Sequence, residues 1–144
     1  MITGKYPYLR LRRNRKKAWS RKLVQENTLS PNDFILPIFI IDGSNKRELI
    51  SSMPGVYRYT INRLAQIIDK AIKQGIPMVA LFPKTRTSLK NINGSEALNE
   101  DNLVCKAICE IKKRYRNQIG IMCDVALDPY TSHGHDGLIR GDEI

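Results

Sequence analysis

TINRLAQIIDKAIKQGIPMVALF, residues 60–82, joins the pattern of an amphipathic helix directly to that of a buried strand. Apolar side chains recur at spacings of three and four on one helical face: Ile61, Leu64, Ala65, Ile68, Ala71 and Ile72. Gly75 and Pro77 interrupt this pattern, because glycine often ends a helix and proline cannot continue one. Residues 77–82 are then apolar over the length of a strand. The segment predicts a helix near 60–74 and a strand near 77–82.

Similar patterns lie on both sides of this segment. Residues 34–41 form an earlier apolar run that predicts a strand, in which Pro37 has no amide donor and should leave an irregularity or an unpaired side. Residues 100–116 repeat the helical spacing, with acidic residues near the start and basic residues near the end, as the helix dipole favours. Residues 119–127 predict a third strand.

The order strand, helix, strand, helix, strand predicts an α/β fold. Right-handed crossovers between successive strands produce a parallel sheet. The strands are apolar throughout and do not alternate, so we expect a sheet that is covered on both faces. The chain has 144 residues, of which 42% are hydrophobic and 26% charged, and this is the composition of one soluble globular domain.

Positive charge is concentrated at the N-terminus. Residues 1–22 hold nine lysines and arginines and no acidic residue, so 15 of the 24 basic residues and all 14 acidic residues lie beyond them. We expect residues 1–28 to form a basic N-terminal arm and residues 29–144 to form the domain. Cations interleaved with aromatic residues can also bind nucleic acid, although the chain has no helix-turn-helix or zinc-binding sequence.

Cysteine usage and hydropathy indicate a reducing compartment. The three cysteines, Cys105, Cys109 and Cys123, are an odd number without C-x-x-C spacing, which does not suit a disulfide framework. No apolar stretch is long enough for a membrane span or a signal peptide. We therefore expect a cytoplasmic protein that does not bind membranes.

Candidate functional residues follow the third predicted strand. Asp124 lies near the end of this apolar strand, where a carboxylate is costly unless it is paired or used. Functional groups gather at the carboxyl ends of parallel strands. The next loop, DPYTSHGHDG (residues 128–137), contains both histidines of the chain, two aspartates and three hydroxyl groups. These residues suit a metal or acid–base site, but aspartate, serine and glycine also dominate ordinary surface turns, and both interpretations stay open at this point.

The strand and the loop together resemble a known family. CDVALDPYTSHGHDG, residues 123–137, is similar to the metal-loop and active-site segment of the porphobilinogen synthases, also called 5-aminolaevulinate dehydratases. Five shorter segments agree with this family in the same order: LRLRR (9–13), SMPGVYR (52–58), GIP (75–77), ALFP (80–83) and GSEA (94–97). One short segment alone is weak, but five in register with a fifteen-residue signature are specific.

The resemblance implies that the chain is the N-terminal part, about three βα units, of a (βα)8 TIM barrel preceded by an extended arm. It implies a hydro-lyase that condenses two molecules of 5-aminolaevulinate to porphobilinogen, with loss of water, in haem and other tetrapyrrole biosynthesis. It also implies a homo-oligomer, commonly an octamer, in which the arm contacts a neighbouring subunit.

The resemblance places the catalytic residues of the family outside this chain. The two lysines that form Schiff bases with the substrates lie on later strands, so we expect them beyond Ile144 and expect the chain to be inactive alone. Lys84 is the one lysine near the end of a predicted strand, and we interpret it as a solvated residue beside Arg86. The alternatives to the enzyme interpretation are a nucleic-acid-binding protein with a basic arm and a nonfunctional remnant of a split gene.

Site residues follow from the same resemblance. Asp124 matches an acidic residue that lines the substrate pocket. Family members that bind zinc use three cysteines where this chain has Ala126, Asp128 and Asp136, so a three-cysteine zinc site cannot form here. We expect Asp128 and Asp136 either to bind Mg²⁺, directly or through water, or to replace a metal electrostatically. The expected supporting residues of the loop are Tyr130, Ser132, His133 and His135.

Overall fold

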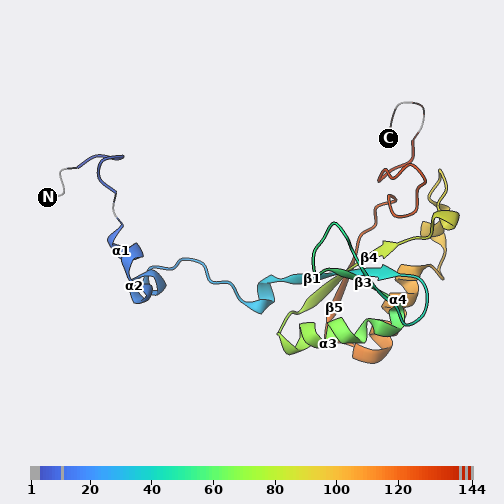
Figure 1. Cartoon of the computed structure of the whole chain (residues 1–144), viewed down its shortest axis with the longest axis horizontal. Helices are drawn as coiled ribbons and strands as arrows, with labels where there is room; N and C mark the ends of the chain where they lie inside the picture. The colour runs from blue at the N-terminus through green and yellow to red at the C-terminus, as the bar shows by residue number, and fades with distance from the viewer. Residues whose placement is uncertain (1–3, 11, 140, 142, 144) are drawn as a thin grey trace. The chain divides into compact units, whose positions relative to one another are not determined.

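The chain is described from a computed structural model (Figure 1). The described residues are 4–10, 12–139, 141 and 143. Residues 1–3 of the predicted arm and Leu11 of the LRLRR segment lie outside them. The chain forms two compact units, residues 1–30 and residues 31–144, and each is described by itself. Among the described residues, no helix has both the length and the apolar character to cross a membrane.

The first unit contains two short helices that the apolar pattern does not predict. They are α1 (Arg13–Lys16) and α2 (Ala18–Leu23). Ser20 is the only buried residue of these helices in the described part of the chain, whereas Tyr8 and Trp19 are 96% and 69% exposed. Helices of four and six residues are marginal unless they pack against something. The described residues of this unit therefore form no apolar core of their own.

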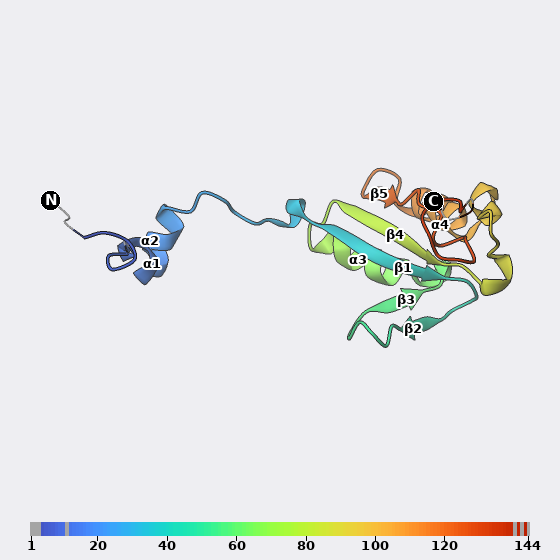
Figure 2. The same cartoon turned by 90° about the horizontal axis from the view of Figure 1, so that it is seen from above.

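The second unit is built on a five-stranded sheet with the order β2-β3-β1-β4-β5 (Figure 2). The strands are β1 (Ile35–Ile41), β2 (Arg47–Leu49), β3 (Tyr57–Tyr59), β4 (Met78–Lys84) and β5 (Gly120–Cys123). β1 pairs in parallel with β3 and β4, and β4 pairs in parallel with β5. β2 runs antiparallel to β3 at the edge. The sheet is thus parallel except for one short edge strand.

Pro37 lies in β1, near the centre of the sheet. β4 pairs with β1 along the whole of both strands, but β3 pairs only with Phe39 and Ile40. Among the described strands, Pro37 therefore has a partner on the β4 side alone. A proline is tolerated there because one side of the strand needs no amide donor.

The β2–β3 pair is absent from the sequence-based prediction. Each strand has three residues, and none of these residues is buried. Side chains stabilise the pair instead: the Arg47 guanidinium lies over the Tyr57 ring, 4.1 Å from its centroid, and the amide of Lys46 donates to the buried Thr60 hydroxyl at 3.0 Å. Polar and cation–π contacts leave no hydrophobic periodicity in a sequence, so the apolar pattern gives no sign of these strands.

The two main helices occupy shorter ranges than those predicted near 60–74 and 100–116. They are α3 (Ala65–Lys73) and α4 (Leu103–Tyr115). The first predicted helix begins as a separate 3-10 turn, Ile61–Arg63, ahead of α3. α4 starts three residues later than predicted because Asn102 caps it, and the Asn102 side chain accepts a hydrogen bond from the Cys105 amide at 2.9 Å.

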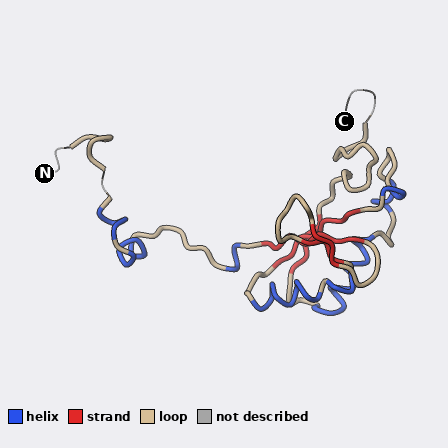
Figure 3. Tube along the Cα trace, in the orientation of Figure 1, coloured by secondary structure: helices blue, strands red, loops and turns tan. Residues whose placement is uncertain are grey.

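Both helices pack on the same face of the sheet (Figure 3). The core on this face comes from alternate strand residues, from one side of each helix and from the residues just before α3 and β5: Ile38, Ile40, Val79, Leu81, Leu64, Ile68, Ala71, Val104, Ala107, Ile111, Tyr115 and Ile119. The Tyr115 hydroxyl of α4 also donates to the Asp69 carboxylate of α3 at 2.6 Å. The prediction that the sheet is covered on both faces is therefore wrong for the described residues.

The other face of the sheet is also apolar, which explains why the strands do not alternate. Ile35 of β1 and Met122 of β5 belong to this face and are 46% and 41% exposed. Ala80 of β4, on the same face, is buried, so this face is only partly exposed. A sheet with helices on one face and a second apolar face without helices is typical of a barrel wall, whose inner face packs against further strands.

The third predicted strand, near 119–127, is shorter than expected. β5 ends at Cys123, whose partner Leu81 is the last residue of β4 to pair with β5. Asp124 is therefore the first residue after the strand and does not lie within it. Its Oδ1 atom accepts a hydrogen bond from the Ala126 amide at 3.1 Å, and this aspartate turn ends the strand.

Candidate functional site

Polar side chains gather where the parallel strands end, on the face without helices. Phe39 of β1 pairs with both Arg58 of β3 and Phe82 of β4, and residues paired across strands point to the same face. The Phe39 and Phe82 rings lie 5.7 Å apart. Lys84 follows Phe82 by two residues, so it lies on the same face at the end of β4.

These residues line a cavity of about 360 Å³ at this edge of the sheet. The other lining residues come from the end of β4 and from the loops after β4 and β5, namely Pro83, Thr85, Lys90, Asp124, Asp128, Pro129 and Tyr130. Barrel proteins place their functional groups at this edge. The cavity is therefore the candidate functional site.

Asp124 lies on the wall of this cavity. Its side chain is exposed, and its hydrogen bond from the Ala126 amide holds the carboxylate in one orientation. The predicted substrate-binding residue is thus positioned by the backbone turn that ends β5. An exposed and oriented carboxylate can accept a hydrogen bond from a ligand amine.

Asp128 is half-buried, and its pKa lies above the ordinary range of a carboxyl group. Burial is the main cause, and the negative charges of Asp136 and Asp124 raise the pKa further, whereas Lys90 opposes the shift. Two further aspartates therefore act electrostatically on Asp128 beside the cavity. Such a group favours a positive partner, which can be a proton, an ammonium group or a metal ion.

The loop that carries Asp128 is attached to the segment after β4. Asn91 and Thr131 form a parallel bridge, in which the Asn91 amide donates to the Tyr130 carbonyl at 3.2 Å and the Ser132 amide donates to the Asn91 carbonyl at 3.0 Å. Gly94 adopts a φ of +61°, and a Cβ atom at this position would lie 3.3 Å from Thr131 Cγ2. Ser132 thus supports the loop through its backbone, while its side chain is exposed.

Both predicted histidines stabilise the loop and neither lines the cavity. The His135 amide donates to His133 Nδ1 at 3.2 Å, so Nε2 of His133 carries the proton and donates to the Ile92 carbonyl at 3.3 Å. The His135 carbonyl accepts from the buried Thr131 hydroxyl at 3.0 Å. Both ring nitrogens of His133 are therefore engaged by the backbone.

Tyr130 is buried, with 8% of its surface exposed, and separates two cavities. The second cavity has a volume of about 220 Å³ and lies beside the loop after β4. Burial raises the pKa of the Tyr130 hydroxyl, and the nearby Cys105 and Cys123 thiols add to the shift. The hydroxyl therefore stays protonated at neutral pH and can donate a hydrogen bond at the edge of the site.

The proposed metal ligands are two carboxylates, Asp128 and Asp136. Within the described part of the chain, no three histidine, cysteine, aspartate or glutamate residues are arranged to hold a metal ion. Asp136 is exposed, but it is close enough to Asp128 to raise the pKa of that carboxyl group. Mg²⁺ commonly uses one or two carboxylates and completes its shell with water. Asp128 and Asp136 are carboxylates of the type and number that such a site uses.

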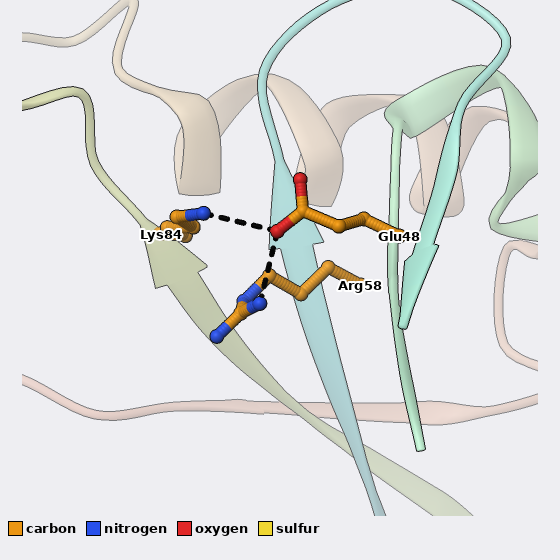
Figure 4. Close-up of polar contacts among 3 residues, drawn as sticks. All are labelled: Glu48, Arg58 and Lys84. Atoms are coloured by element: carbon orange, nitrogen blue, oxygen red, sulfur yellow. Dashed lines mark hydrogen bonds and ion pairs between the residues drawn. The ribbon is translucent and has the colours of Figure 1, made fainter. Parts of the chain in front are cut away.

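The cationic side of the cavity is absent from the sequence-based prediction. Glu48 Oε1 accepts hydrogen bonds from Arg58 Nη1 and from Lys84 Nζ, each at 3.0 Å (Figure 4). Both cations lower the pKa of Glu48, with Lys84 the larger contributor. Lys84 is therefore ion-paired and is not simply a solvated residue beside Arg86. Arg58 belongs to the SMPGVYR segment, and that resemblance was the only signal for it.

A parallel sheet with helices on one face, and with a polar cavity at the carboxyl ends of its strands, defines a segment of a (βα)8-barrel protein. Comparison with known proteins gives the family. Its sequence profile, described as delta-aminolevulinic acid dehydratase, matches residues 8–144. The chain belongs to the delta-aminolevulinic acid dehydratase family.

Relatives of this family match nearly all of the chain. A delta-aminolevulinic acid dehydratase from Bradyrhizobium diazoefficiens is 55% identical over 136 residues, which cover 94% of this chain and 38% of that protein. The corresponding protein from Chlamydia pneumoniae is 42% identical over 135 residues, covering 94% and 40%. The chain thus spans about two-fifths of the length of these relatives.

A solved structure has the same fold. It is delta-aminolevulinic acid dehydratase (porphobilinogen synthase) from Toxoplasma gondii in complex with the reaction product porphobilinogen. The TM-score is 0.85 at 39% sequence identity, and the match covers 92% of this chain and 37% of that chain. The described chain is therefore the N-terminal part of a (βα)8 TIM barrel, as the resemblance implies.

Proposed function

We propose that this chain forms one wall of the active site of a porphobilinogen synthase. The reaction condenses two molecules of 5-aminolaevulinate to porphobilinogen with loss of water. The observation that supports this proposal is the cavity at the carboxyl ends of the strands, whose lining combines Asp124 and Asp128 with Arg58 and Lys84. The family of the chain supplies the identity of the substrate.

Asp124 binds and orients the amino group of a substrate molecule in this proposal. Its carboxylate is exposed on the cavity wall and fixed by the Ala126 amide. Burial is the main cause of the raised pKa of Asp128, and the negative charges of Asp136 and Asp124 raise it further. These two charges favour an ammonium group over an anion on this side of the cavity. Tyr130 supports the site as a buried hydrogen-bond donor.

The chain supplies no Schiff-base lysine in this proposal. A Schiff base requires a neutral amine, but Lys84 forms an ion pair with Glu48 and Lys90 donates to the Asp128 carbonyl at 3.3 Å. Both amines are therefore used in contacts that suit the charged form. The Schiff-base lysines of the family would come from residues outside this chain, and the chain alone would be inactive.

Asp128 and Asp136 hold Mg²⁺ in this proposal, and water molecules complete its shell. Hard carboxylate oxygens suit Mg²⁺ better than the softer metals that prefer thiolates. A bound Mg²⁺ would supply positive charge beside the substrate. The metal-free alternative, in which the aspartates act only electrostatically, predicts activity that neither chelator nor added Mg²⁺ changes.

The N-terminal arm contacts a neighbouring subunit of a homo-oligomer, an octamer in the family. The support is that Tyr8 and Trp19 are largely exposed while the described residues of the arm form no apolar core. Large exposed aromatic residues are typical of surfaces that become buried on association.

The free cysteines suit a cytoplasmic location.

Split-chain complementation tests the proposed function. The chain is assayed for porphobilinogen alone, and again after mixing with the separately expressed remainder of the Bradyrhizobium relative. We expect no product from the chain alone and product from the mixture. Asp124→Asn should reduce the rate of the mixture by roughly 100-fold, because it removes an oriented charge, whereas Glu110→Gln on the exposed side of α4 should not. Product from the chain alone would contradict the assignment of the lysines.

A further inference from the structure

Thr131 lies in the middle of the loop after β5 and is fully buried, with 0% of its surface exposed. Hydrogen bonds join the two ends of this loop. The Leu127 amide donates to the Asp136 carbonyl at 3.1 Å, and the Thr131 amide donates to the Leu127 carbonyl at 2.9 Å. The Thr131 hydroxyl donates to the His135 carbonyl at 3.0 Å. Thr131 therefore connects the start of the loop to its end, through its backbone on one side and its side chain on the other.

The methyl group of Thr131 faces a second loop. Gly94 belongs to the segment after β4, and a Cβ atom at Gly94 would lie 3.3 Å from Thr131 Cγ2. The same two segments pair through the bridge between Asn91 and Thr131. Serine lacks the methyl group and valine lacks the hydroxyl group, so threonine suits both contacts.

The loop that Thr131 closes carries two of the aspartates beside the cavity. Asp128 lies in the turn between Leu127 and Thr131, and its residue lines the cavity of about 360 Å³. Asp136 lies at the far end of the loop, where its charge acts on Asp128. The position of both carboxylates relative to the cavity therefore depends on how firmly the loop is closed.

The Thr131 hydroxyl differs in burial from the histidine contacts of the loop. The bonds that His133 makes with the His135 amide and with the Ile92 carbonyl are exposed, whereas the bond of the Thr131 hydroxyl is partly buried. Water can replace a lost partner at an exposed group, but it cannot readily reach a buried one. Loss of the Thr131 hydroxyl should therefore loosen the loop more than loss of either histidine contact.

We propose that Thr131 is a positioning residue whose hydroxyl keeps the loop closed, so that Asp128 stays at the cavity wall with Asp136 beside it. Thr131 itself is not among the residues that line the cavity, so it acts through these aspartates. The inference rests on the proposed function for the identity of the substrate.

The closed loop favours the ammonium group of that substrate. The carboxylates of Asp124, Asp128 and Asp136 outnumber the ammonium group of Lys90, which lines the same side of the cavity and donates to the Asp128 carbonyl at 3.3 Å. A closed loop holds these charges in one arrangement, whereas a loose loop must be ordered when the substrate binds, and that ordering weakens binding.

Kinetics of the split-chain mixture test this inference. KM and kcat for 5-aminolaevulinate are measured with the unmodified chain and with its variants. Thr131→Val keeps the shape of the side chain but removes the donor, and it should raise KM by roughly three- to tenfold with little change in kcat. Thr131→Ser keeps the donor and should restore KM. Thr87→Val, at an exposed position in the segment after β4, is the matched control.

The comparison of KM with kcat separates positioning from a loss of folding. A chain that folds less completely forms fewer active complexes, which lowers the apparent kcat and leaves KM unchanged. A lower kcat at constant KM in Thr131→Val would therefore overturn the inference. An increase in KM that Thr131→Ser shares would also overturn it, because that result would assign the effect to the methyl group.

Amide hydrogen exchange of the full chain measures the closure of the loop without any activity. Thr131→Val should speed exchange of the Leu127 amide several-fold, because this amide is protected by its bond to the Asp136 carbonyl. Thr131→Ser and Thr87→Val should exchange like the unmodified chain. Unchanged exchange of this amide in Thr131→Val would contradict the proposed role of the hydroxyl.

The two measurements together distinguish the inference from the proposed function. If Thr131→Val speeds exchange but the mixture forms porphobilinogen with an unchanged KM, the inference fails and the proposed function stands. If the mixture with the unmodified chain forms no porphobilinogen, the proposed function fails, and the role of Thr131 in substrate binding fails with it.

Discussion

Asp124 and Asp128 illustrate how a backbone turn and a charge cluster make a site from ordinary residues. Asp124 is oriented by the Ala126 amide as the chain leaves β5. Asp128 is less favourable as an anion, because it is half-buried and close to two other carboxylates. Functional sites often retain groups that lower stability, because a carboxylate that is buried near other carboxylates binds a positively charged ligand more tightly.

Replacing Asp128 should stabilise the fold at neutral pH. The folded-state pKa of Asp128 is raised, so the contribution of Asp128 to the free energy of unfolding is fully present below the ordinary carboxyl pKa. That contribution is lost as the pH rises through the raised pKa and the buried carboxyl group becomes charged. Asp128→Asn has no charge to gain and therefore avoids this loss of stability. We expect the variant to have the larger free energy of unfolding at pH 7, measured by urea denaturation with chelator present, and expect the difference to vanish near pH 3.

Added Mg²⁺ provides the counterpart of this measurement. If Asp128 and Asp136 bind the ion, Mg²⁺ should raise the melting temperature of the unmodified chain and leave Asp128→Asn unchanged. If Asp128→Asn is less stable than the unmodified chain at pH 7 without metal, the charged form of Asp128 does not destabilise the fold.

The residues on the negative side of the site could be predicted from the sequence, whereas those on the positive side could not. Asp124 is visible because a charge adjoins an apolar run. Arg58 and Lys84 lie in polar contexts where solvated cations are common, and their convergence on Glu48 depends on the pairing of β2, β3, β1 and β4. No local pattern contains that information.

Among the elements, helices with an apolar stripe and strands with continuous apolar runs were predictable, because burial itself produces these patterns. The β2–β3 pair was not, since none of its residues is buried. The placement of both helices on one face was also missed. A strand that is apolar on both sides looks the same whether its second face meets helices or the interior of a barrel.

The start of α4 depends on one side chain. Asn102 is buried, and its oxygen accepts from the Cys105 amide at 2.9 Å. Asn102→Ala should lower the free energy of unfolding by about 1 kcal/mol, because it leaves an amide of the first turn without this partner. Asn102→Asp should retain most of the stability, and Asn93→Ala, at an exposed loop position, should have little effect. Equal unfolding curves for the unmodified chain and Asn102→Ala would refute this role.

On the scale of the whole chain, the uncovered face of the sheet is the dominant feature. Ile35 and Met122 are 46% and 41% exposed on this face, and β5 has no partner on its outer edge among the described strands. An apolar face and an open edge both favour association. These features are the expected consequence of a segment that spans about two-fifths of its relatives.

Self-association of the isolated chain should therefore depend on this face. Light scattering coupled to size-exclusion chromatography should show a mass that rises with concentration. Met122→Lys should reduce the association, whereas Leu98→Lys should not, because Leu98 is 87% exposed in a turn outside the sheet. A monodisperse monomer at all concentrations would contradict this expectation.

The proposed role of the chain as the N-terminal wall of a porphobilinogen synthase can be measured directly. The measurement is porphobilinogen formation by a fusion in which residues 8–144 replace the matching segment of the Bradyrhizobium enzyme. We expect product at a rate comparable to that of the parent enzyme. A fusion that folds and assembles like the parent but forms no porphobilinogen would contradict this role.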